Sequence, residues 1–114
     1  MAAAVKEEEK VVKVVDARFK QEVLEAAQPV LVDFAAAWCA PCRALAPVLE
    51  QLAVQYKGRV KVAQVDVDDN QVVAQTYGIR SLPTLLLFKG GRVVEQIVGA
   101  VPRQKLEDAL RKVV

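Results

Sequence analysis

The sequence WCAPC at residues 38–42 contains the only two cysteines of this 114-residue chain, Cys39 and Cys42. It joins an apolar, strand-like run at residues 30–35 to a helical pattern at residues 40–56. A Cys-x-x-Cys pair between such a strand and helix is typical of a redox centre in which a dithiol and a disulfide interconvert. We therefore expect the chain to exchange two electrons and two protons with another disulfide.

Two other uses of this cysteine pair have less support. A purely structural disulfide between residues three apart closes a very short loop, and chain entropy gives it only about 2 kcal/mol. A zinc site usually has four ligands, whereas the chain has two cysteines and no histidine, so a closed site would need a second subunit. We therefore expect no bound metal.

The composition is typical of one globular domain. The chain is 54% apolar and 26% charged, and its length allows a single buried core. A net charge of +2 without a long basic block argues against nucleic-acid binding. No apolar run reaches the roughly 18–20 residues that a membrane span needs. Residues 7–9 are glutamates where a secretory signal would be apolar, so we expect a cytoplasmic protein.

Hydrophobic periodicity predicts alternating strands and helices. Residues 1–10 are a charged, alanine-rich extension that we expect to fray. Asp16 is the expected N-cap of the first helix, and Gly90 and Gly91 form the expected two-residue turn of a hairpin. Strands are expected at residues 11–15, 30–35, 60–67, 85–88 and 92–98, and helices at residues 16–26, 40–56, 70–77 and from 102 onward. This order predicts parallel βαβ units with one antiparallel hairpin.

Six motifs together give residues 11–114 a resemblance to the thioredoxin family. They are VLVDF at 30–34, WCAPCR at 38–43, AP at 46–47, YGIR at 77–80, LPTLLLF at 82–88 and VGA at 98–100, in the family's order and spacing. The resemblance implies an α/β thioredoxin fold, with a central mixed sheet of four to five strands flanked by about four helices. It also implies a monomeric disulfide reductase without a cofactor, which acts on disulfide-containing proteins and is recharged by thioredoxin reductase.

The expected positions of the two cysteines on the helix assign a role to each. The N-terminus of a helix has unpaired N–H groups and a partial positive charge, which favour a thiolate over a thiol. Cys39 lies at that end and is the expected nucleophile. Cys42 lies one turn further along, so its side chain returns to the same face as the expected resolving thiol.

The resemblance assigns roles to further residues near the dithiol. Asp33 becomes a buried proton acceptor for Cys42, although a strand-end carboxylate could also face solvent. Pro83 becomes a cis proline beside the dithiol, although it could also be a trans proline at the start of a strand. The backbone of Leu82 would then pair with an extended substrate. The other expected substrate-contacting residues are Trp38, Ala40, Pro41, Val67, Gly78, Val98 and Gly99.

Three positions depart from the family pattern. Ala35 stands where the family usually has a second tryptophan, and Ala40 stands where glycine is commoner. Gln64 stands where many relatives have a lysine near the buried aspartate. These departures affect the redox potential and proton transfer rather than the type of reaction. Two alternatives to a reductase are a disulfide oxidant or isomerase of the same fold and a non-enzymatic binding subunit.

Overall fold

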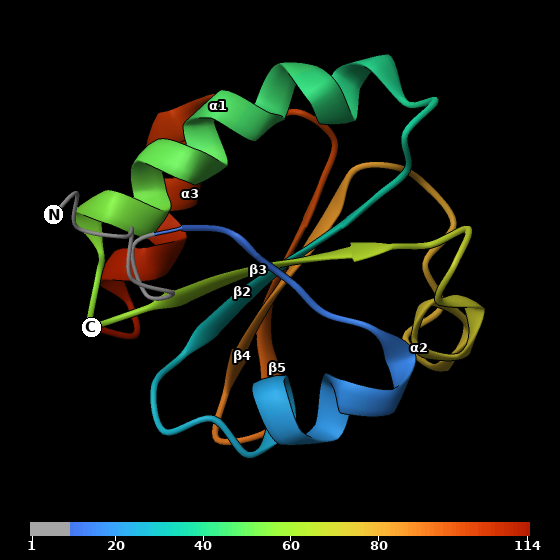
Figure 1. The fold of residues 1–114 in the computed structure, drawn as a ribbon. Helices are drawn as coiled ribbons and strands as arrows, with labels where there is room; N and C mark the ends of the chain where they lie inside the picture. The colour runs from blue at the N-terminus through green and yellow to red at the C-terminus, as the bar shows by residue number, and fades with distance from the viewer. Residues whose placement is uncertain (1–9) are drawn as a thin grey trace, which may run out of the picture.

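The computed structural model describes residues 10–114, which form a five-stranded sheet covered by helices on both faces (Figure 1). The strands are β1 (Val12–Lys13), β2 (Val30–Ala35), β3 (Lys61–Asp66), β4 (Thr84–Lys89) and β5 (Arg92–Val98). The helices are α1 (Ala40–Gln55), α2 (Gln71–Thr76) and α3 (Arg103–Arg111), preceded by a 3₁₀ turn η2 (Asp16–Arg18) and a π-helical turn η3 (Lys20–Leu24). All of the expected N-terminal extension except Lys10 lies outside the described residues.

The strand order in the sheet is β1-β3-β2-β4-β5. β3 pairs in parallel with both β1 and β2, whereas β4 pairs antiparallel with β2 and β5. The mixed sheet predicted from the βαβ units and the hairpin is therefore confirmed. Gly90 and Gly91 have φ angles of 60° and 78°, the left-handed conformation that a tight two-residue hairpin turn requires at both positions.

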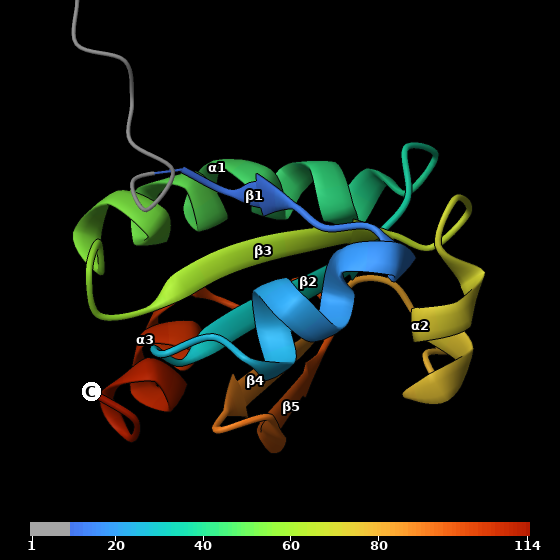
Figure 2. The same ribbon diagram turned by 60° about the horizontal axis from the view of Figure 1, so that its bottom comes forward.

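Successive side chains of the strands point to opposite faces of the sheet, and each face packs into its own hydrophobic core. On one face, Leu31 packs in a cluster with Leu49 of α1 and Leu106 of α3. On the other face, Phe34 packs in a cluster with Phe19 from the N-terminal turns. Figure 2 shows α1 on one side of the sheet and the N-terminal turns with α2 on the other. Every residue of β2 is buried, as expected for a central strand covered on both faces.

The first helix differs from the prediction. Residues 16–26 were expected to form one regular helix with Asp16 as its own N-cap, but they form the irregular turns η2 and η3. Asp16 instead accepts hydrogen bonds from the backbone N–H groups of Val72 (3.3 Å) and Val73 (2.9 Å), in the first turn of α2. Asn70, which precedes α2, donates its side-chain amide to the Asp66 carbonyl, so Asp16 caps that helix in its place.

Candidate active site

The two cysteines lie at the start of α1, just after the end of β2. Cys39 is the N-cap of α1, and Cys42 lies in its first turn beside Pro41, whose missing N–H is tolerated at that position. A disulfide joins the two cysteines, with their Cα atoms 5.3 Å apart. The backbone N–H of Cys42 donates to Cys39 Sγ over 3.2 Å. After reduction, this N–H and the helix N-terminus favour a thiolate on Cys39.

Both cysteines are buried in a small apolar cluster. Cys39 is 4% exposed and Cys42 is 3% exposed, and they cluster with the buried Ala35 and its neighbour Ala36. The partly buried Val67 and Leu82 pack against this cluster, so the fold brings two of the expected substrate-contacting residues to the dithiol.

Trp38 differs from the cysteines because its side chain is 67% exposed. Its indole Nε1–H donates to the Asp68 carboxylate over 2.9 Å, which fixes the ring at the surface beside the dithiol. Sequence reasoning missed Asp68. The acidic turn that follows β3 could have indicated it. Because β2 and β3 are adjacent parallel strands, their carboxyl ends meet at one edge of the sheet, which brings this turn close to the segment that follows β2. Ala40 and Pro41 are also exposed there.

The segment around Pro83 has the geometry that the resemblance implied. The Leu82–Pro83 peptide bond is cis, and the Pro83 carbonyl accepts a hydrogen bond of 2.8 Å from the Gly99 N–H. Val98 pairs with the first residue of β4, so the expected residues at the ends of β4 and β5 lie side by side. Gly78 is exposed and lies two residues after the end of α2, with a φ of 65°. Its contact with a substrate stays a prediction.

Asp33 is fully buried in the middle of β2, so the alternative of a solvent-exposed strand-end carboxylate is wrong. Gln64 lies opposite it on β3 and donates from Nε2 to Asp33 Oδ2 over 3.2 Å. The other carboxyl oxygen, Oδ1, has no hydrogen-bond partner within residues 10–114. Burial raises the pKa of Asp33 from the ordinary value of 3.8 to about 6, although the Gln64 hydrogen bond lowers it in part.

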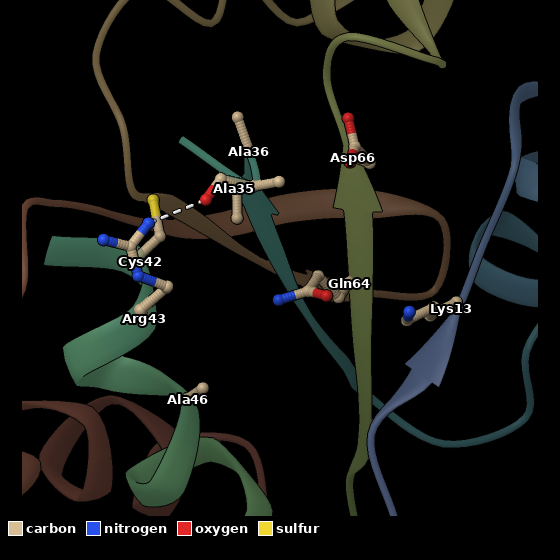
Figure 3. Close-up of a pocket in the computed structure, with 9 residues that line it drawn as sticks. Lys13, Ala35, Ala36, Cys42, Arg43, Ala46, Gln64 and Asp66 are labelled. Carbon is tan, nitrogen blue, oxygen red and sulfur yellow. Dashed lines mark hydrogen bonds between the residues drawn. The ribbon is translucent and has the colours of Figure 1, made fainter. Parts of the chain in front are cut away.

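A cavity of about 230 Å³ opens beside Cys42, between the start of α1 and strands β3 and β1 (Figure 3). Figure 3 shows Gln64 extending from β3 toward α1 in this space. Small side chains leave the space open, and a tryptophan in place of Ala35 would project into it. The lining residues are Lys13, Ala35, Ala36, Ala37, Cys42, Arg43, Ala46, Gln64 and Asp66.

Two further features bear on the expected chemistry. Within residues 10–114, no group of three or more His, Cys, Asp or Glu side chains could hold a metal ion, and the two cysteines are bonded to each other. No helix in the described part of the chain is long and apolar enough to cross a membrane.

Comparison with known proteins gives one consistent relationship. The family model described as Thioredoxin matches residues 10–112. Thioredoxin 1 of Nostoc sp. is 56% identical over 99 residues, which cover 87% of this chain and 92% of the relative. Thioredoxin 1 of Synechococcus elongatus is 57% identical and thioredoxin of Porphyra purpurea is 50% identical, each over 99 residues that cover 87% of this chain and 92% of the relative. Since this likeness extends along almost the whole described chain and includes the dithiol, the chain belongs to the thioredoxin family and is a dithiol protein-disulfide reductase.

Proposed function

We propose that Cys39 is the attacking thiol of this reductase and Cys42 the resolving thiol. The Cys39 thiolate attacks a substrate disulfide, forms a mixed disulfide and releases the first substrate thiolate. Cys42 then loses its proton, attacks Cys39 Sγ and releases the second substrate thiolate, which leaves the Cys39–Cys42 disulfide. The observation that carries this assignment is the hydrogen bond from the Cys42 N–H to Cys39 Sγ at the N-terminus of α1.

Asp33 is the proton acceptor for Cys42 in this scheme, acting through water. Its pKa of about 6 lets it exchange a proton near neutral pH. Its position supports the role, because Asp33 lies two residues before Ala35 on the same face of β2, and Ala35 packs in the cluster of the cysteines.

A substrate peptide binds in extended form across the surface around the dithiol. Leu82 precedes β4 and takes part in none of its ladder pairs, which leaves its backbone for pairing with the peptide. The exposure of Trp38 supports its contact with the substrate. The proposed contact residues are Trp38, Ala40, Pro41, Val67, Gly78, Leu82, Val98 and Gly99, and Pro83 is the proposed cis proline beside the dithiol.

The chain acts as a monomeric electron carrier in the cytoplasm, with residues 11–114 as one domain. A compartment that keeps thiols reduced suits a disulfide reductase. A thioredoxin reductase restores the dithiol after each turnover, and no cofactor takes part in the exchange itself.

Single-cysteine variants test the assignment with insulin as a defined protein disulfide. Cys42→Ser should accumulate a mixed disulfide with insulin through Cys39, because the resolving attack is lost. Cys39→Ser should form almost none. Non-reducing gels and intact-protein mass spectrometry measure both, and trapping by Cys39→Ser instead would reverse the two roles. A reduction potential of the Cys39–Cys42 couple, measured against glutathione, separates a reductase from a disulfide oxidant.

A further inference from the structure

We propose that the cavity beside Cys42 binds a small planar aromatic molecule with an N–H donor, of the size of indole, and that this molecule slows the resolving attack by Cys42. The binding site itself is independent of the proposed function. Its effect on the exchange rests on that function, because it concerns the step in which Cys42 attacks the mixed disulfide on Cys39.

The cavity has the size of a two-ring aromatic molecule. Its volume is about 230 Å³. An apolar protein cavity of roughly 150 Å³ is large enough to bind benzene. The cavity here is about half as large again, and indole has half as many non-hydrogen atoms again as benzene. Drug-sized ligands occupy larger pockets, of roughly 300–1,000 Å³, so the occupant is a small molecule.

The inner wall of the cavity is apolar and offers a flat ring a surface to pack on. Ala35, the last residue of β2, and the following Ala36 are buried there, and Ala46 lines the cavity from α1 (Figure 3). The tryptophan that the family usually has at position 35 would place its own indole ring in this space. Alanine leaves that volume to a ligand, whose buried ring supplies most of the binding free energy.

The polar residues of the lining add a hydrogen-bond acceptor and two positive charges. Asp66 accepts two backbone N–H groups of the following turn through Oδ1, and its second carboxylate oxygen can accept the N–H of a ligand. Asp66 is paired with Ala35 in the ladder of β2 and β3, so this acceptor lies beside the space that the alanine leaves. Lys13 and Arg43 are exposed residues of the lining, and a cation there can stack on the face of an aromatic ring. These groups favour a ring with an N–H over a hydrocarbon ring.

A molecule in the cavity lies against the resolving thiol and not against the attacking one. Cys42 lines the cavity, and Cys39 does not. Gln64, which donates a hydrogen bond to the Asp33 carboxyl group, lines the cavity as well. The ligand therefore displaces the water through which Asp33 is proposed to take the proton of Cys42. The first attack by Cys39 keeps its rate.

Binding is tested with indole and the oxidised wild-type protein. Isothermal titration calorimetry should give a dissociation constant of about 1 mM or tighter, the range open to a ligand of this size. NMR should show shifted backbone amide signals of lining residues such as Ala36 and Ala46. 1-Methylindole, which has no N–H, should bind about tenfold more weakly. No binding of indole, amide shifts confined to other parts of the surface, or equal affinity for the two ligands would overturn the proposal.

Ala35→Trp is the matched variant, because its own ring fills the cavity and the family usually has tryptophan at this position. It should bind indole more weakly than the wild-type protein, by about tenfold or more. Ala44→Trp, the same change at an exposed position of α1 outside the lining, should bind indole as the wild-type protein does. Equal affinity of these two variants, both folded, would overturn the proposal.

The effect on the exchange is measured by stopped flow, as the first and second thiols released from a small symmetric disulfide by the reduced protein. Saturating indole should slow the second release about tenfold, because the proton path from Cys42 is blocked, and leave the first unchanged. Indole should change neither release in Ala35→Trp. An unchanged second release at saturating indole would overturn the effect on Cys42. Insulin trapping by Cys42→Ser tests the proposed function separately, because it uses no indole and depends on Cys39 alone.

Discussion

Gln64 Nε2 lies 3.2 Å from Asp33 Oδ2 and is the hydrogen-bond partner of a carboxyl group that solvent does not reach. The two residues are paired directly in the parallel ladder of β2 and β3. An amide at this position solvates the carboxyl group without contributing a charge. Burial therefore remains the stronger influence, and the pKa of Asp33 stays raised at about 6.

Asp33→Asn should stabilise the protein at neutral pH. A folded-state pKa raised from 3.8 to about 6 means that the folded protein holds the proton more tightly than the unfolded chain. Stability is therefore lost as the pH rises from about 4 to about 6, and the loss is complete above that range. It amounts to roughly 3 kcal/mol, at 1.36 kcal/mol for each pH unit. Urea unfolding should show the variant's advantage at pH 7.5 and little of it at pH 4.

An equal effect of Asp33→Asn at both pH values would contradict this explanation. The asparagine side chain has nearly the same shape and can still accept the hydrogen bond from Gln64. Any advantage that does not depend on pH would therefore come from packing rather than from the cost of a buried carboxylate.

Features that depend on local sequence were predictable. The apolar run of β2 matches its observed bounds, Val30–Ala35, because a strand covered on both faces requires such a run. The start of the following helix was also predictable, because Pro41 suits a first turn. The contact between Asp33 and Gln64 was predictable from family spacing, which places the lysine of many relatives near the buried aspartate. The two residues lie opposite each other because β2 and β3 are parallel strands in which Asp33 is paired with Gln64.

Features that depend on tertiary proximity were not predictable. Asp16 looked like the cap of its own helix, but it caps a helix more than 50 residues away in the sequence. The hydrogen bond between Trp38 and Asp68 also joins residues that are far apart in the sequence, at a separation of 30 positions. The cavity is also a product of packing. The alanine at position 35 indicated a missing side chain, but only the fold shows that Ala46 and Lys13 border the same space.

Asp16→Ala should destabilise the protein through α2. The substitution removes the acceptor for two N–H groups in the first turn of that helix. Loss of an N-cap costs about 1–2 kcal/mol, and the free energy of unfolding in urea should fall by that amount. Asp69→Ala removes an exposed carboxylate from the turn before α2 and serves as the control. A similar loss in both variants would point to a general charge effect rather than to capping.

Cys39 should be alkylated faster than Cys42 in the reduced protein at slightly acidic pH. The helix N-terminus and the Cys42 N–H stabilise the thiolate of Cys39, and only the thiolate reacts. Iodoacetamide at pH 6.5, followed by peptide mass spectrometry, should label Cys39 about tenfold faster. Cys42 should gain on it as the pH rises and its own thiolate forms. Equal labelling of both thiols across the pH range would remove the basis for calling Cys39 the nucleophile.

Gln64→Lys should lower the pKa of Asp33 below its value of about 6. An ammonium group in place of the amide would lie close to the carboxyl oxygen and favour its charged form, which opposes the effect of burial. Gln64→Met is the matched control: it keeps a side chain of similar length but donates no hydrogen bond, so the pKa should rise instead. Carboxyl carbon titration by NMR measures all three proteins, with Asp33→Asn identifying the signal.

Gln64→Lys should also slow one step of the disulfide exchange more than the other. An Asp33 that is already ionised at lower pH accepts a proton more weakly, so Gln64→Lys should slow the attack by Cys42 more than the first attack by Cys39. Stopped-flow measurement of the first and second thiols released from a small symmetric disulfide separates the two steps. If the Asp33 titration does not move in Gln64→Lys, then the lysine does not meet the carboxyl group. If it moves while both steps keep their rates, then Asp33 does not carry the proton of Cys42.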